Sequence, residues 1–181
     1  MLPPRLVAHL LAFGLLVAAV PAQAGFKCPA KGGSEWREGQ TLAYLVDFLD
    51  SDTGRPRFRL YYQDAPANAP VSQVHPSILA EKRVDVALLC VGTFDQVNDH
   101  PGAIITALNP RYVVAGHWES FFQPQSDPTP PLPFLNVGLF ASRMAALLSA
   151  SPEAPARVNG GKDEHRGWMP DPETRFEFSA E

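Results

Sequence analysis

The stretch VDVALLCVGTFDQVNDHPGAIITALNPRYVVAG, residues 84–116, carries the strongest fold signal of the chain. Residues 84–92 are an almost continuous apolar run, which is typical of a strand covered on both faces. Pro101 opens a helical segment that Asn109-Pro110 ends, and residues 111–116 are a second apolar strand. Because such strand–helix–strand units almost always have parallel strands and a right-handed connection, the sequence predicts an α/β fold.

The flanking segments extend this unit. Residues 41–49 and 57–63 are rich in apolar and aromatic side chains, and the intervening DSDTGRP contains turn formers, so they predict a hairpin with a longish loop. Residues 76–82 predict a short helix with Pro76 in its first turn. If residues 57–63 run parallel to the two later strands, this short helix is the crossover. The apolar spacing in residues 137–149 predicts a further, longer helix.

The N-terminus has the pattern of a secretory signal peptide. Arg5 precedes an apolar stretch at residues 10–20 that is short for a membrane span, and Ala22-Gln23-Ala24 offers small residues for cleavage. Residues 1–24 are therefore expected to be removed, which gives a secreted or periplasmic protein without a membrane association. The alternative is a retained membrane anchor, which the shortness of the apolar stretch disfavours.

The remaining 157 residues suit one domain over residues 25–150 and a tail over residues 151–181 (181 − 24 = 157). Residues 25–40 read as a polar loop. Prolines gather at residues 124–133 and 152–172, so the tail is expected to be irregular, with a short strand near residues 175–178 at most. The net charge is −4 and the sequence has no basic run. We therefore expect no nucleic-acid partner.

The two cysteines leave a choice open. In an exported protein Cys28 and Cys90 could form a disulfide. Cys90 lies in the apolar run, where a buried free thiol is the better interpretation.

Several groups that bind metals follow the predicted parallel strands. Asp64 follows the first of them, Asp95, Asp99 and His100 the second, and His117 and Glu119 the third. The carboxyl ends of parallel strands share one edge of a sheet, where ligands of open α/β sheets gather. Carboxylates and imidazoles are ligands for zinc, iron or manganese. Taken singly, each of these residues is better explained as a turn residue or a helix cap.

Three blocks together resemble the C-terminal half of the metallo-β-lactamase-fold hydrolases: RLYYQDAP, VDVALLCVG and HPGAIITALNPRYVVAGHWESFF. The resemblance covers roughly residues 35–122. It implies part of an αββα sandwich, a mixed sheet flanked by helices, in a truncated form. It also implies that Asp64 bridges two metals, that His117 binds the second metal, and that Trp118 forms a wall of the site. The reaction of the family is hydrolysis assisted by two metals.

The chain departs from this family in its metal ligands. The motif His-x-His-x-Asp-His is absent, and no two of the five histidines lie within four residues of each other. The resemblance supplies two ligands, Asp64 and His117, whereas a catalytic zinc site has three and a water. His100 and Glu119 are candidates for an extra ligand or for residues that surround the ligands, so zinc or another divalent metal is expected at low occupancy. Whether the chain is an enzyme stays open.

Three functions are compatible with these patterns. The first is an exported hydrolase-like protein that has lost the N-terminal half of its fold and acts on a small-molecule substrate if it is active. The second is a non-catalytic binding or assembly module, and the third is a weak periplasmic metal binder. Half a sandwich is expected to leave one face of the sheet uncovered, which favours a homo-oligomer through that face.

Overall fold

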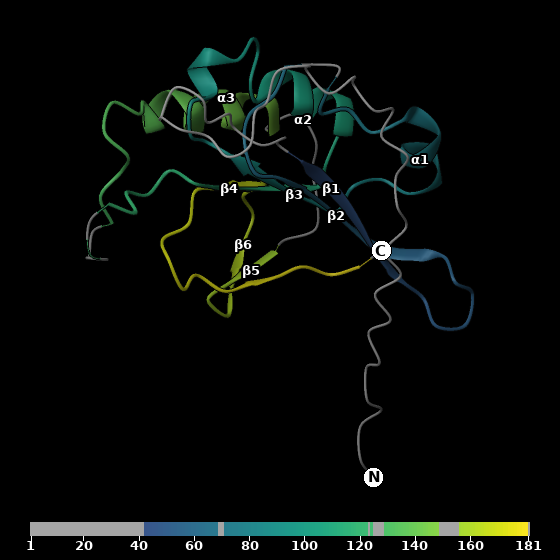
Figure 1. Cartoon of the computed structure of the whole chain (residues 1–181). Helices are drawn as coiled ribbons and strands as arrows, with labels where there is room; N and C mark the ends of the chain where they lie inside the picture. The colour runs from purple at the N-terminus through teal and green to yellow at the C-terminus, as the bar shows by residue number, and fades with distance from the viewer. Residues whose placement is uncertain (1–41, 69–70, 123, 125–128, 149–155, 181) are drawn as a thin grey trace, which may run out of the picture. The chain divides into compact units, whose positions relative to one another are not determined.

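A computed structural model describes residues 42–68, 71–122, 124, 129–148 and 156–180 (Figure 1). Residues Gln40–Glu181 form one compact unit. The expected signal peptide, the loop at residues 25–40 and Cys28 lie outside the described residues. No helix among the described residues is long and apolar enough to cross a bilayer.

The described elements form an α/β fold with a five-stranded mixed sheet in the order β1-β2-β3-β4-β7 and a three-stranded sheet in the order β6-β5-β8. In chain order the elements are β1 (Ala43–Leu49), β2 (Pro56–Gln63), α1 (Pro76–Glu81), β3 (Val86–Cys90), the 3-10 helix η2 (Phe94–Gln96), α2 (Gly102–Leu108), β4 (Tyr112–Gly116), α3 (Val137–Leu148), β5 (Ala156–Val158), β6 (Gly161–Asp163), β7 (Gly167–Trp168) and β8 (Phe176–Glu177).

The predicted hairpin and the predicted parallel unit are both confirmed. Strands β1 and β2 pair antiparallel, and the side chain of Asp50 holds their loop by accepting hydrogen bonds from the backbone N–H groups of Asp52 and Thr53 at 3.1 and 2.9 Å. Strands β2, β3 and β4 are parallel neighbours, with α1 and α2 in the two connections. The carboxyl ends of these three strands therefore lie at one edge of the sheet.

The helices cover one face of the five-stranded sheet, and the small sheet lies on its other side (Figure 1). The core on the helix side includes Tyr61 of β2, Leu89 of β3 and Val113 of β4, which pack with Ile104 of α2 and Phe140 of α3. These residues are at most 3 % exposed. The alternation of strand side chains puts the opposite set on the other face.

The tail expected to be irregular is instead part of the fold. It contains β5, β6, β7 and β8, and β7 extends the main sheet by pairing parallel to β4. A Cβ on Gly167 would lie 2.7 Å from Leu148 Cδ1, so glycine here permits close packing of β7 against α3. Strands of two or three residues are too short to produce a periodic pattern, and their pairing with distant segments carries no local signal.

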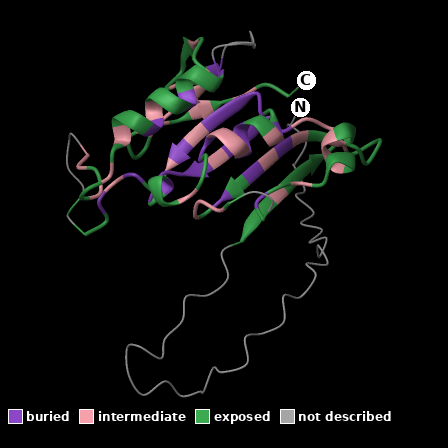
Figure 2. Cartoon of the chain, turned by 90° about the horizontal axis from the view of Figure 1, so that it is seen from above, coloured by how far each residue is buried: buried purple, intermediate pink, exposed green. Residues whose placement is uncertain are grey.

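The face opposite the helices is covered only in part, which corrects the expectation of an uncovered face. Ala156 of β5 and Phe178 pack on Val86 and Tyr112 in a second apolar cluster. The aromatic and aliphatic side chains at the β1 side of this face stay exposed, by 38–55 %: Tyr44, Val46 and Phe48. Buried residues are accordingly concentrated in the central strands, as Figure 2 shows.

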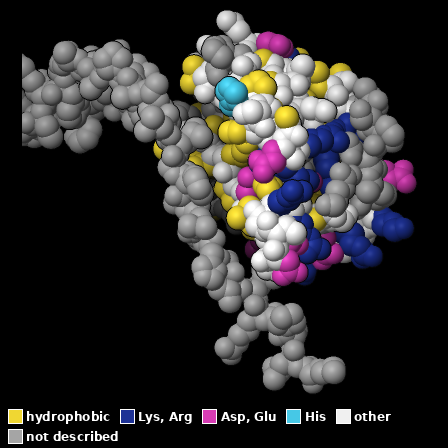
Figure 3. Space-filling view, turned by 90° about the vertical axis from the view of Figure 1, so that its right-hand side faces the viewer, with side chains coloured by type: hydrophobic (Ala, Val, Ile, Leu, Met, Phe, Trp, Pro, Cys, Tyr) yellow, Lys and Arg dark blue, Asp and Glu magenta, His cyan; other side chains and the backbone are white. Residues whose placement is uncertain are grey.

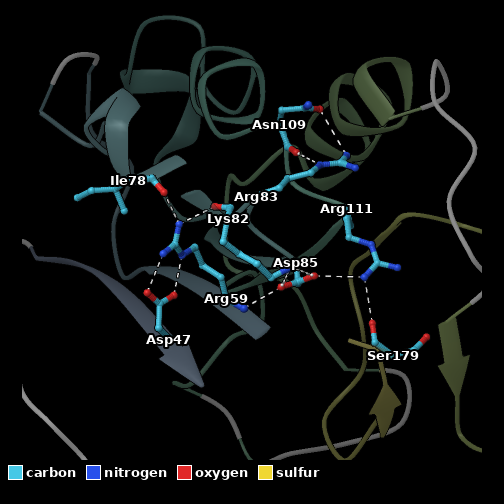
Figure 4. A network of polar contacts seen from close by, with 9 residues as sticks. All are labelled: Asp47, Arg59, Ile78, Lys82, Arg83, Asp85, Asn109, Arg111 and Ser179. Atoms are coloured by element: carbon cyan, nitrogen blue, oxygen red, sulfur yellow. Dashed lines mark hydrogen bonds and ion pairs between the residues drawn. The ribbon is translucent and has the colours of Figure 1, made fainter. Parts of the chain in front are cut away.

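Buried charges connect the amino ends of β2, β3 and β4 (Figure 4). Asp85 is fully buried and accepts hydrogen bonds from the Arg59 backbone N–H at 2.7 Å and from Arg111 Nη1 at 3.2 Å. The Arg59 guanidinium, 1 % exposed, donates to both carboxylate oxygens of Asp47 and to the backbone carbonyls of Ile78 and Lys82. This network joins β1, β2, β3, β4 and α1 at one edge of the sheet.

The exposed surface carries charges of both signs. On the side of the molecule drawn in Figure 3, Lys and Arg side chains lie next to Asp and Glu side chains with hydrophobic side chains between them. A mixed surface of this kind agrees with the small net charge of the sequence.

Candidate functional site

A pocket of about 330 Å³ opens at the carboxyl ends of β2, β3 and β4. Each strand contributes its last residues and the residues that follow it. The lining residues are Tyr62, Gln63, Asp64, Leu88, Leu89, Cys90, Val114, Ala115, Gly116, His117, Trp118, Glu119, Pro170, Asp171 and Pro172. The volume is at the lower end of the range of small-molecule sites.

Four of the residues predicted for a site lie in this pocket: Asp64, His117, Trp118 and Glu119. The parallel arrangement of the strands brings them together, as the sequence predicted. Trp118 is 8 % exposed and forms a wall. Glu119 Oε2 accepts a hydrogen bond from the backbone N–H of Trp118 at 2.9 Å, which restrains its carboxylate beside the strand end.

His117 has a left-handed backbone conformation, with φ of 59°. A residue with a Cβ adopts this region at a cost of about 1–3 kcal/mol, and such conformations cluster at functional sites. The turn separates the imidazole from the strand and places it beside Cys90, with Nδ1 3.4 Å from Sγ. The ring of Phe121 follows at a centroid distance of 5.7 Å. After β4, the chain thus places His117 at the pocket and the ring of Phe121 beside it.

His100 is not a pocket residue, which corrects its assignment as a candidate ligand. It is 2 % exposed, its Nε2 lies 3.1 Å from the carbonyl oxygen of Cys90, and its ring packs near Phe140 of α3. Burial lowers the pKa of His100, so the neutral ring is favoured. It is a core histidine that joins β3 to the helices. Asp95 and Asp99 are exposed and do not line the pocket either.

The Cys90 thiol is a pocket residue that the sequence analysis assigned to the core alone. It is free and 3 % exposed. Burial, with the negative charges of Asp64 and Glu119 as further causes, raises its pKa to about 11. The protonated thiol is therefore the form at neutral pH, and its chemistry is that of a weak hydrogen-bonding group.

Asp64 is bonded within its own strand end. Its Oδ1 accepts a hydrogen bond from the hydroxyl of Tyr62 at 2.9 Å. This bond, followed by burial and the charge of Asp64, raises the pKa of Tyr62. Asp64 is exposed and lines the pocket.

Gln63 and the segment Pro170, Asp171 and Pro172 are pocket residues that the sequence analysis did not find. The alternation of β2 places Gln63 on the face that packs against the helices, where an apolar residue is expected. A polar residue at a core position was therefore the sequence signal that could have identified Gln63. The three tail residues reach the pocket through the pairing of β7 with β4, which leaves no local trace in the sequence.

Within the described parts of the chain, no three His, Cys, Asp or Glu side chains lie close enough together to hold a metal ion. The pocket offers two pairs instead: Asp64 with Tyr62, and His117 with Cys90. These donors do not fit a three-ligand catalytic zinc site.

Comparisons with models of known protein families, with curated proteins and with solved structures found no match to this chain.

Proposed function

We propose that this chain is an exported protein related to the metallo-β-lactamase-fold hydrolases that corresponds to the C-terminal half of their fold and does not hydrolyse substrates by itself. The observation that carries the proposal is the joint presence of Asp64 and His117 in one pocket at the carboxyl ends of β2 and β4. These are the two positions that the resemblance assigns to metal ligands, and strand ends are where such ligands are placed in α/β sheets.

The described residues supply no third donor close to these two, which is why activity is not expected. A catalytic zinc ion lowers the pKa of a bound water only when protein ligands hold it firmly. Of the other acidic or thiol groups in the pocket, Cys90 is protonated, Glu119 accepts a hydrogen bond from the Trp118 backbone, and Asp171 does not form a group of three possible ligands with Asp64 and His117. The proposal is therefore weak binding of zinc or a similar ion, without a hydrolytic step.

The layer order supports the proposed partial sandwich. Helices lie on one face of the main sheet and strands lie on the other, so two sheets and one helix layer are present (Figure 1). In this proposal the small sheet occupies part of the space that the second half of a sandwich would fill.

Metal content and activity of the purified chain without residues 1–24 test the proposal. We expect less than one zinc ion per chain, less still in His117→Ala, and no turnover of an ester or phosphodiester panel. His165→Ala is the matched control because this histidine is 83 % exposed and lies outside the pocket. Equal metal content in His117→Ala and the wild type would contradict the metal assignment, and zinc-dependent turnover would contradict the loss of activity.

Assembly is a second candidate function, which the exposed part of the sheet favours. Tyr44, Val46 and Phe48 form an apolar strip on β1, the edge strand of the sheet. Edge strands with exposed apolar side chains are sites of pairing between chains. We expect a concentration-dependent dimer in sedimentation that Phe48→Glu abolishes, whereas Val71→Glu, at a more exposed position between β2 and α1, leaves it intact. A wild-type chain that stays monomeric at all concentrations would contradict this candidate.

A further inference from the structure

The thiol of Cys90 and the imidazole of His117 lie side by side at the pocket. Sγ and Nδ1 are 3.4 Å apart, although the two residues follow each other at a separation of 27 positions and belong to the ends of the neighbouring strands β3 and β4. Both residues line the pocket. Bonds from a metal ion such as zinc to sulfur and to imidazole nitrogen are about 2.3 and 2.0 Å long, so an ion beside the pair reaches both atoms without a movement of the strands.

The thiol lies on the face of the sheet at which the pocket opens. Along β3, Cys90 is on the same face as Val86 and Leu88, because side chains alternate along a strand. Val86 and Leu88 belong to the apolar cluster opposite the helices, whereas Leu89 belongs to the core on the helix side. Leu88 and Val114, which share the face of Cys90, line the pocket. The pocket therefore gives an ion a route to the thiol.

The pair supplies one soft donor and one imidazole. Within the described ranges of the chain, no three His, Cys, Asp or Glu side chains lie together as a metal group. Thiolate sulfur selects zinc and monovalent copper, and imidazole binds both metals. A zinc site takes three protein ligands even when it is catalytic, whereas monovalent copper is stable with a thiolate and one further ligand. The missing third donor, which disfavours zinc, is thus no obstacle to Cu(I).

The surroundings of the thiol suit an uncharged complex. Cys90 is 3 % exposed, and the pocket walls formed by Leu88, Val114 and Trp118 are apolar. Burying a net charge in such surroundings costs free energy. A thiolate, a neutral imidazole and Cu(I) together carry no net charge, so the bound ion adds no charge to the apolar walls.

We propose that Cys90 and His117 bind one Cu(I) ion, with Sγ and Nδ1 as its two protein ligands. On binding, a copper–sulfur bond replaces the bond between sulfur and its proton, and the proton passes to solvent. The copper enters in the monovalent state, so no electron is transferred. The site needs neither Asp64 nor the family resemblance, and it goes beyond the weak zinc binding proposed above.

Competition with a chromophoric Cu(I) chelator, carried out without oxygen, tests the site. The chain without residues 1–24 carries Cys28→Ser, so that Cys90 is its remaining cysteine. We expect one Cu(I) per chain, held about 100-fold more weakly in Cys90→Ser and about tenfold more weakly in His117→Ala. Cys90→Ala serves the same test if the serine variant does not fold. No binding of Cu(I) would overturn the proposal, and so would an unchanged affinity in His117→Ala, because the thiol would then bind alone.

Two further measurements separate this site from the proposed zinc site. Cys90→Ser should weaken Cu(I) but not zinc, and Asp64→Asn should weaken zinc but leave the affinity for Cu(I) within about twofold of the wild type. His165→Ala, which changes an exposed histidine outside the pocket, is the matched control for His117→Ala. Equal weakening of Cu(I) in Asp64→Asn and Cys90→Ser would overturn the two-ligand site. X-ray absorption of the copper-loaded chain should show one sulfur and one nitrogen ligand, and two sulfur ligands, which would come from two chains, would overturn it.

Discussion

The two ends of the same three strands differ in how they treat buried polar groups. At the amino ends of β2, β3 and β4, the buried Asp85 bonds the Arg59 backbone and the Arg111 guanidinium (Figure 4). At the carboxyl ends, Gln63 is equally buried and has no partner within the described structure. The polar groups at the amino ends hold the strands together. At the carboxyl ends, the amide of Gln63 is without a hydrogen bond in the described structure.

This difference separates structural from functional polar groups. Breaking a buried ion pair is costly, so residues such as Asp85 and Arg59 fix one arrangement of the strands. An unpaired amide at Gln63 and a left-handed backbone at His117 both destabilise the fold locally. Both residues line the pocket, and His117 is the one pocket residue among the described non-glycine residues with positive φ.

The largest effect is expected at the amino ends. Asp85→Ala removes this carboxylate from the Arg111 guanidinium, from Lys82 and from the Arg59 backbone N–H, so it should lower the free energy of unfolding by about 3–5 kcal/mol. Denaturant unfolding measures this change. Asp52→Ala, in the exposed β1–β2 loop, should stay within about 0.5 kcal/mol of the wild type. A small loss in Asp85→Ala would show that the network does not hold the strands.

The opposite sign is expected at the carboxyl ends. Gln63→Leu should raise the free energy of unfolding by about 1 kcal/mol, because the unpaired amide is replaced by an apolar group of similar size. The same unfolding assay applies without added ligand. A clear loss of stability would mean that Gln63 is bonded in the free protein, and the comparison between the two strand ends would fail.

A pH effect of intermediate size is expected from His100. Its pKa is lowered from 6.5 in the folded chain by burial, so the unfolded chain binds more protons below that pH. Stability should therefore be full above pH 6.5 and fall as the pH drops toward the folded pKa, by at most about 1.4 kcal/mol per pH unit. Unfolding at several pH values measures this slope.

A flatter slope in His100→Phe and the wild-type slope in the exposed His165→Gln would assign the effect to the core histidine. The same slope in His100→Phe would contradict the assignment.

The last effect concerns the rate of a reaction of Cys90 and leaves the stability of the fold unchanged. Burial raises the pKa of Cys90 to about 11, so iodoacetamide at pH 8 should alkylate it roughly 100-fold more slowly than an unfolded thiol. Mass spectrometry of the native and the denatured chain compares the two rates. Rapid alkylation of native Cys90 would show that the pocket exposes a thiolate and would revise its description as a weak hydrogen-bonding group.

Much of the central fold could be predicted from the sequence. Turn formers between two apolar runs predicted the hairpin, and the alternation of apolar strands with the segment from Pro101 to Asn109 predicted the parallel unit. Parallel strands then required Asp64 and His117 to lie at one edge, and both line the pocket. His100 lies outside the pocket for a physical reason: its place in the sequence is close to the strand end, but its ring packs in the core beside Phe140.

The sequence by itself determined the elements whose signals are local: the hairpin, the crossover helices, the central parallel strands and the edge at which polar residues gather. Only the tertiary structure decided that the tail joins the sheet through β7, that it covers part of the second face, and that Pro170, Asp171 and Pro172 complete the pocket. Periodicity and turn chemistry act over a few residues and are visible in the sequence. Contacts between segments about 50 residues apart depend on shape and packing, which no short pattern encodes.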